Sequence, residues 1–234
     1  MKVDKPRDLH PSIWLWCVPL PLLIHLGIHQ LDASGDYFSV WIESESGLIE
    51  NATALLLIPA TIFALSLGLH FYRLFGLAYL VWFVSVAAVC FGFAGEEVSW
   101  GQHWIGWDSP EYFAEHNRQG ETNIHNLNIQ FGRVVKSILT LAIVVGGLVL
   151  PFRRKASALA GTRFRRFLDR VTPTTVCVPA AAFVLGVRLI ERLKTWFDLD
   201  WTIIAVNLKE SQELYIALFL LIYVWSARIR ARGC

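Results

Sequence analysis

The chain alternates between long apolar blocks and shorter polar segments. Each apolar block is about 18 to 22 residues long, the length that a helix needs to cross the hydrocarbon core of a bilayer. The blocks predict six spans, roughly over residues 11–30, 48–70, 75–95, 134–151, 171–187 and 214–231. No polar segment exceeds about 40 residues, so none could form a soluble core of its own. The pattern predicts one all-α domain, residues 1–234, built as a polytopic transmembrane helical bundle.

The polar segment between the third and fourth spans, residues 96–133, is rich in Trp, Phe and Ile. Ser109 and the proline after it favour the start of a helix, and Gly120 favours its end. A second short helix is expected over residues 121–127. We therefore expect a folded loop that packs over the bundle, not a flexible linker.

The composition supports membrane insertion. Hydrophobic residues make up 55% of the chain, charged residues make up 17%, and the mean hydropathy is +0.46. A soluble domain would have about a quarter of its residues charged. The four cysteines are widely scattered, which favours small core residues over disulfides or thiolate ligands.

The distribution of charge predicts the orientation. Residues 1–10, Arg73, residues 152–170 and the C-terminal tail contain 14 of the 21 basic residues. The segments on the other side of the membrane contain 16 of the 19 acidic residues. Because cytoplasmic segments are enriched in Lys and Arg, both termini are predicted to be cytoplasmic. The basic runs are interpreted as topology determinants that contact lipid headgroups, and no nucleic-acid partner is expected.

Acidic and histidine residues gather at the outer ends of the predicted spans. Carboxylates and imidazoles from several helices at one depth are the ligands that a zinc or di-iron site needs. The candidate metal ligands are Glu50, Glu96, Glu97, Glu121, His125 and Glu213. Zinc and iron are the candidate cofactors. Carboxylates held close together also suit acid–base catalysis, so the candidate catalytic residues are Glu96, Glu97, Ser99 and Gln102.

Simpler interpretations compete for other members of this gathering. Glu45 and Glu210 lie near the N-termini of predicted helices, where the positive end of the helix dipole would stabilise their negative charge. His25 and His29 lie one turn apart and are interpreted as hydrogen-bonded interior residues. Arg188 and Glu191 are expected to form an internal salt bridge. These interpretations leave the Glu96–Glu97 dipeptide unexplained, because acids at the C-terminal end of a span oppose the dipole.

Four segments, ESGLIENATALLL, FAGEEVSWGQ, GETNIHN and ESQELYIAL, resemble a family of bacterial integral membrane proteins with EExSWGQ and ETNxHN motifs. The resemblance covers roughly residues 40–225. Its pattern positions include Glu50, Glu96, Glu97, Ser99, Trp100, Gln102, Glu121, Asn123, His125, Asn126 and Glu213, whereas His103 replaces a more usual Arg. The resemblance implies a multi-pass protein of the bacterial cytoplasmic (inner) membrane and carries no activity with it.

Three functions are compatible with these observations. The first is a membrane-embedded metal-dependent enzyme, a hydrolase or di-iron-type oxidase, that acts on a lipid or lipid-linked substrate at the outer face. The second is a non-catalytic subunit or assembly factor whose outer loop binds a partner protein. The third is a cation- or proton-coupled transporter, which the scarcity of polar residues in the inner half, where His70 is nearly alone, disfavours.

Overall fold

The computed structural model describes residues 8–10, 12–13, 18–31, 47–152, 162–198 and 208–232, and these residues are predominantly helical. The chain is therefore all-helical, as predicted, with five apolar helices long enough to span a membrane. The longer helices are α2 (Leu20–Leu31), α3 (Leu48–Phe75), α4 (Leu77–Glu97), α7 (Ile129–Val144), α8 (Arg163–Val171), α9 (Val178–Phe197) and α10 (Leu208–Ala231). The short ones are η2 (Ser99–Gly101), α5 (Gln102–Ile105), α6 (Glu111–His116), the π-helical turn η3 (Val145–Val149) and η5 (Thr175–Cys177).

Five of the six predicted spans coincide with apolar helices of sufficient length. These helices run over Leu48–Phe75, Leu77–Glu97, Gly132–Val149, Arg163–Phe197 and Leu208–Ala231. In the region of the first predicted span, α2 has 12 residues, fewer than the roughly 20 that cross a bilayer. The helices thus support a multi-pass membrane protein, and the first predicted span, over residues 11–30, stays a prediction.

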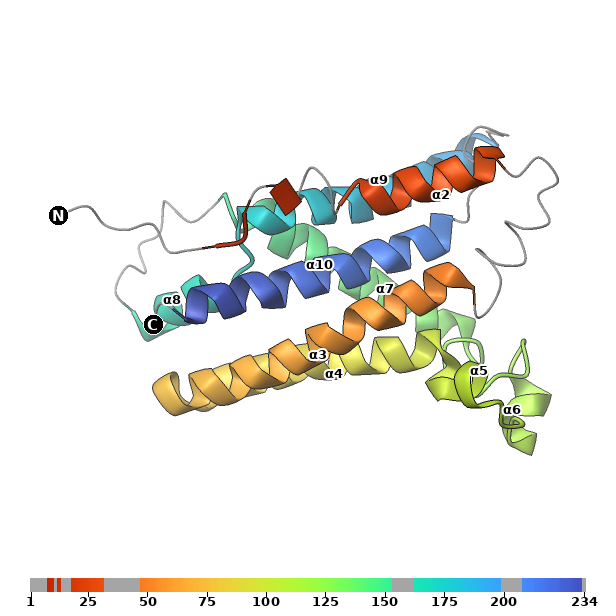
Figure 1. Cartoon of the computed structure of the whole chain (residues 1–234), viewed down its shortest axis with the longest axis horizontal. Helices are drawn as coiled ribbons and strands as arrows, with labels where there is room; N and C mark the ends of the chain where they lie inside the picture. Colours follow the sequence, from red (N-terminus) through yellow and green to blue (C-terminus); the bar gives the residue numbers. More distant parts are fainter. Residues whose placement is uncertain are drawn as a thin grey trace.

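Helix α10 is the centre of the bundle because it packs on both α3 and α9 (Figure 1). Its residues from Tyr215 to Leu220 are all buried. Helices α3 and α4 form a tight antiparallel hairpin around Gly76, whose φ of 96° suits a residue without a Cβ. Their close approach is visible at Gly68, where an added Cβ would lie 3.4 Å from the Cβ of Phe83.

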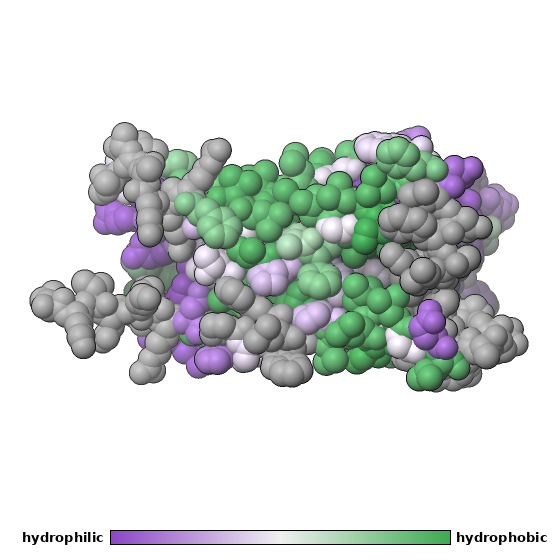
Figure 2. Space-filling view, turned by 90° about the horizontal axis from the view of Figure 1, so that it is seen from above, coloured by the Kyte–Doolittle hydropathy of each residue, from purple (hydrophilic) through white to green (hydrophobic). Residues whose placement is uncertain are grey.

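The face of the molecule seen in Figure 2 has an apolar belt between two polar ends. Helices α3, α4 and α7 also expose Leu, Ile and Val side chains, including Leu55, Ile62, Val81 and Ile138. Apolar side chains exposed in this continuous way are expected on helices that face lipid.

The two ends of the bundle differ in charge. At one end, here called the arginine end, lie α8 and the last turns of α3 and α10, with Arg73, Arg170, Arg228 and Arg230 (Figure 1). At the opposite end, here called the loop end, α5 and α6 follow α4. The predicted separation of bases from the motif acids is therefore present in the fold.

The π-helical turn after α7 lets that helix approach its neighbours closely. A Cβ added at Gly147 would lie 2.5 Å from the Cβ of Ala181 in α9 and 2.8 Å from Cε2 of Phe219 in α10. The adjacent Gly146 is less confined, because a Cβ there would meet Cγ of Pro173 at 3.6 Å. Gly147 is thus a packing position where three helices meet.

We predict that Gly147→Ala destabilises the bundle by about 1–3 kcal/mol, because the new methyl group overpacks the contact with α9 and α10. The melting temperature of the purified protein in detergent should fall. Gly146→Ala is the matched control and should leave the melting temperature unchanged or slightly higher. Equal melting temperatures for the two variants would contradict this account of the packing.

Candidate functional site

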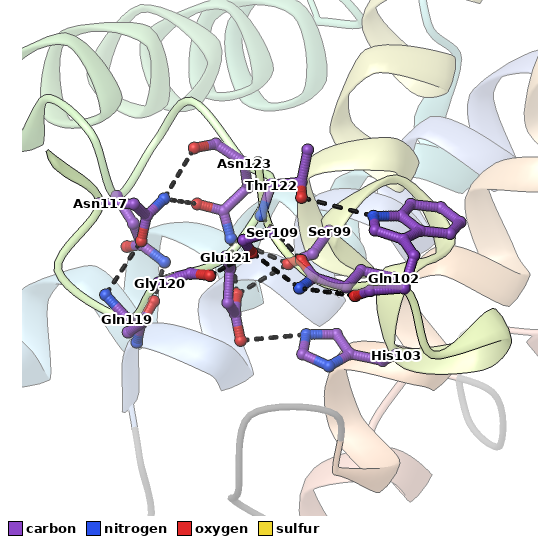
Figure 3. Close-up of polar contacts among 12 residues, drawn as sticks. Ser99, Gln102, His103, Ser109, Asn117, Gln119, Gly120, Glu121, Thr122 and Asn123 are labelled. Atoms are coloured by element: carbon purple, nitrogen blue, oxygen red, sulfur yellow. Dashed lines mark hydrogen bonds and ion pairs between the residues drawn. The ribbon is translucent and has the colours of Figure 1, made fainter. Parts of the chain in front are cut away.

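The segment from residue 98 to residue 128, here called the loop cap, is folded around the carboxylate of Glu121 (Figure 3). Ser99 Oγ and Asn123 Nδ2 each donate to Glu121 Oε2 at 2.7 Å. His103 Nε2 lies 3.0 Å from Glu121 Oε1. Asn117 extends the network by donating to both the carbonyl and the side-chain oxygen of Asn123. Ser99, Asn117 and Asn123 are buried, so the network forms the interior of the loop cap.

Gln102 joins the two halves of the loop cap. Its Nε2 donates to Ser109 Oγ at 2.8 Å, and its Oε1 accepts from the backbone N–H of Thr122 at 2.8 Å. Ser109 Oγ in turn donates to the carbonyl of Gly120. The prediction that Ser109 caps a helix is wrong, because its hydroxyl is used across the loop and Pro110 precedes α6 instead. The predicted first loop helix is present but shorter, as α6.

The carboxylate of Glu96 attaches the loop cap to the end of α4. Its Oε2 accepts from the backbone N–H groups of Ile124 and His125 at 2.7 and 2.9 Å, and its Oε1 accepts from Trp100 Nε1 at 2.9 Å. The imidazole of His125 lies 3.3 Å from the same carboxylate. Charge-assisted hydrogen bonds of this kind are about twice as strong as neutral ones. They explain why an acid is tolerated at a helix C-terminus.

The chain turns sharply between α4 and α5. Ser99 and Trp100 have φ values of 46° and 58°, which non-glycine residues rarely adopt, and Gly101 has a φ of 97°. The Trp100 ring folds back over Gly95, where a Cβ would lie 2.8 Å from the indole. The SWG sequence is thus part of a strained turn that positions the loop cap.

The neighbouring Glu97 belongs to a second group of charges inside the bundle. It interacts electrostatically with Glu213, Glu50 and Glu210, and with the ammonium group of Lys136. We call these five residues the carboxylate cluster. They come from four helices, α3, α4, α7 and α10, and meet near the loop end. Lys136 forms a salt bridge with Glu213. The side chain of Glu97, by contrast, accepts no hydrogen bond within the part of the chain that the structure describes.

Buried polar side chains lie next to this cluster along α3 and α10. Thr53 lies one turn after Glu50 and is fully buried. Gln212, also buried, donates to Thr140 Oγ1 at 3.2 Å. Thr53 Oγ1 and Gln212 Oε1 have no hydrogen-bond partner among the described residues. Because buried polar atoms are normally satisfied, this layer is suited to water or a polar group of a ligand.

The six predicted metal ligands are divided between three separate arrangements. Glu96 pairs with His125, Glu121 pairs with His103, and Glu97, Glu50 and Glu213 lie in the carboxylate cluster. Among the described residues, no group of three or more His, Cys, Asp or Glu side chains is arranged to hold a metal ion. Zinc or iron binding by Glu50, Glu96, Glu97, Glu121, His125 and Glu213 together is therefore not supported.

The second short helix expected over residues 121–127 is absent, because residues 124–128 form a turn before α7. The spacing of four residues between Glu121 and His125 therefore does not place the two side chains on one helix face. Glu121 contacts His103 instead. By contrast, the expected salt bridge between Arg188 and Glu191 is confirmed at 2.8 Å. Glu45 lies outside the described residues, as do the side chains of His25 and His29 in α2.

Sequence reasoning did not select three members of the site. Lys136 was not considered, although a lysine within an apolar span usually has a carboxylate partner in another span. Thr53 and Gln212 carried no signal, because polar residues are common near span ends. The candidate catalytic residues Ser99 and Gln102 stay predictions, and both are used in holding the loop cap.

The chain matches no protein-family model, no curated protein and no solved structure. The function is therefore inferred from the contacts within the loop cap and the carboxylate cluster.

We predict that Glu121→Gln loosens the loop cap, because the amide cannot accept from Ser99, Asn123 and His103 as the carboxylate does. Loss of one such buried acceptor costs about 1–3 kcal/mol. Hydrogen exchange of peptides from residues 98–128 should become faster in Glu121→Gln. Glu111→Gln, an exposed change in α6, is the control and should exchange like the wild type. Unchanged protection in Glu121→Gln would show that this carboxylate does not hold the loop cap.

Proposed function

We propose that the chain is a membrane-embedded enzyme that uses the carboxylate cluster for acid–base chemistry on a lipid or lipid-linked substrate. The observation that carries the proposal is Glu97, a half-buried carboxylate that makes no hydrogen bond among described residues and lies near three other carboxyl groups. Ionisable groups within membrane helices are costly, and they usually mark functional sites. Neighbouring carboxyl groups can also share and transfer protons, as general acid–base catalysis requires.

The proposal places the loop end at the outer face. The arginine end carries the basic residues that favour the cytoplasmic side, so both termini would be cytoplasmic in a bacterial inner membrane. A substrate held at the loop end would then be reached from the outer leaflet. The apolar belt around α3 and α4 suits a substrate with an acyl or isoprenoid chain.

The loop cap would act as the support of this site. Glu96 fixes the loop cap to α4, and the next residue, Glu97, faces a different direction because successive helical residues differ by about 100°. Rigid attachment of the loop cap would therefore fix the last turn of α4 and the position of Glu97. In this proposal Ser99, Gln102 and Glu121 are positioning residues.

The centre of the bundle favours an enzyme over a transporter. Between the two ends, Leu57, Ala60, Phe83 and Ile216 are completely buried and apolar. A cation or proton that left the carboxylate cluster would meet this layer rather than a polar path. Zinc or iron dependence stays a prediction from the sequence, and the acid–base work proposed here is assigned to the carboxylates.

The exposed apolar residues of the loop cap favour a second candidate function, the binding of a partner protein. The exposed fractions of Trp104, Ile105 and Tyr112 are 53%, 76% and 62%. Aromatic residues are enriched at protein interfaces. In that function the polar motif residues would only hold the shape of the loop cap.

We predict that Glu97→Gln abolishes the enzyme activity with little change in the folded structure. Lipids and lipid-linked glycans would be compared by mass spectrometry in cells that lack the chain and in cells complemented with each variant. Wild type should change the amount of at least one lipid species, and Glu97→Gln should lower the rate of that conversion about 100-fold or more. Glu111→Gln, which removes an exposed carboxylate, should behave as wild type.

Variants must be present in the membrane at equal abundance and have equal melting temperatures. A Glu97→Gln protein that meets this condition and restores the wild-type lipid profile would contradict the acid–base proposal. If an Ile105→Ser, Tyr112→Ser double variant were inactive in the same assay while Glu97→Gln was active, the partner-binding function would be favoured.

A further inference from the structure

A cavity lies at the arginine end, far from the carboxylate cluster. It has a volume of about 220 Å³ and is open to the surface between α3 and α10. Its lining residues are Ser66, Leu67, His70, Arg228, Ala231 and Arg232. Leu67 and Ala231 are buried and form its apolar part, whereas the other lining residues are polar or basic. Among the described residues, no carboxylate contributes to the lining.

Among the described residues, the two arginines that line this cavity form no salt bridge. Arg228 lies in the last turn of α10, Arg232 follows the last residue of that helix, and both side chains line the cavity. Arg228 lies over the ring of Phe63 at 4.5 Å, and within the described parts of the chain neither arginine forms a salt bridge with a carboxylate. Like charges at this spacing are destabilising, although the helix dipole favours bases in the last turn. A bound anion would remove the repulsion.

The neighbouring surface of α3 suggests what kind of anion fits. Ile58, Ile62, Ser66 and His70 follow one another at four-residue intervals, so they form one row along the helix. The first two are exposed, at 42% and 57%, and lie on the bilayer side of the cavity. A ligand with a phosphate at the arginines and a hydrocarbon chain along the isoleucines would therefore satisfy both parts of the surface.

We propose that this cavity binds the phosphate headgroup of an anionic membrane lipid. Arg228 and Arg232 would pair with the phosphate oxygens, and His70 would supply a further donor. Guanidinium groups are well suited to phosphate because they present several donors in one plane. A zwitterionic headgroup would bind more weakly, because its own cation would lie next to two arginines. The site is independent of the carboxylate cluster and of the enzyme activity proposed above.

The test titrates the purified full-length protein in detergent with phosphatidylglycerol, phosphatidylcholine or inorganic phosphate, and counts bound molecules by native mass spectrometry. Wild type should retain one phosphatidylglycerol more tightly than phosphatidylcholine. The double variant Arg228→Gln, Arg232→Gln should bind it about 30-fold more weakly, from roughly 1 kcal/mol for each basic group at a membrane surface. The matched control, Arg163→Gln with Arg166→Gln, removes two exposed bases of α8 at the same end and should bind as wild type.

The outcomes separate a built site from general attraction to a basic surface. Equal weakening in the two double variants, or no weakening in either, would overturn the proposal. Inorganic phosphate should not displace the lipid, and Ile62→Ser should weaken lipid binding because it shortens the apolar row. If phosphate bound as tightly as the lipid and Ile62→Ser had no effect, the site would be one for free phosphate and the lipid assignment would be wrong.

Discussion

The structure of the loop end depends on the hydrogen bonds that the carboxylate of Glu96 accepts from the loop cap. Two backbone N–H groups and the indole of Trp100 meet this one side chain at the end of α4. The two backbone hydrogen bonds connect Glu96 to residues 28 and 29 positions further along the sequence. Without them the helix would end in an unfavourable charge, because the carboxylate opposes the negative end of the helix dipole. The adjacent Glu97 has no comparable set of donors among the described residues, and the two carboxylates therefore differ in role although they are neighbours in the sequence.

The fold class could be predicted from the sequence because it depends on hydropathy summed over a long block of residues. A block such as residues 48–70 is apolar over many turns, and the cost of leaving it in water decides its location without any knowledge of its neighbours. Boundaries were less certain, since α3 continues to Phe75 through a turn that contains Arg73. Residues at the arginine end lie outside the hydrocarbon core. Hydropathy therefore does not predict where the helix ends there.

The candidate site could be predicted only as a set of residues. The gathering of acids at one end followed from topology, but the partner of each acid depends on tertiary structure. Residues 121–127 were expected to form one helix, whereas they form turns, and the reversal of the chain at Ser99 and Trp100 brings His103 to Glu121. Spacing along the sequence predicts contacts only inside a regular helix. In a loop, backbone turns set by a few residues decide which side chains meet.

The carboxylate of Glu121 and the carboxylate cluster differ in how their negative charge is compensated, and this difference separates a structural role from a chemical one. The carboxylate of Glu121 is matched by Ser99, Asn123 and His103, so its burial is compensated and its role in stability is sufficient to explain it. In the carboxylate cluster, the single ammonium group of Lys136 faces four carboxyl groups and is already paired with Glu213. Replacing buried charges by apolar residues is often neutral or stabilising, so stability alone does not account for such a group. The closeness of three other carboxyl groups to Glu97 is what proton transfer at this end of the bundle would require.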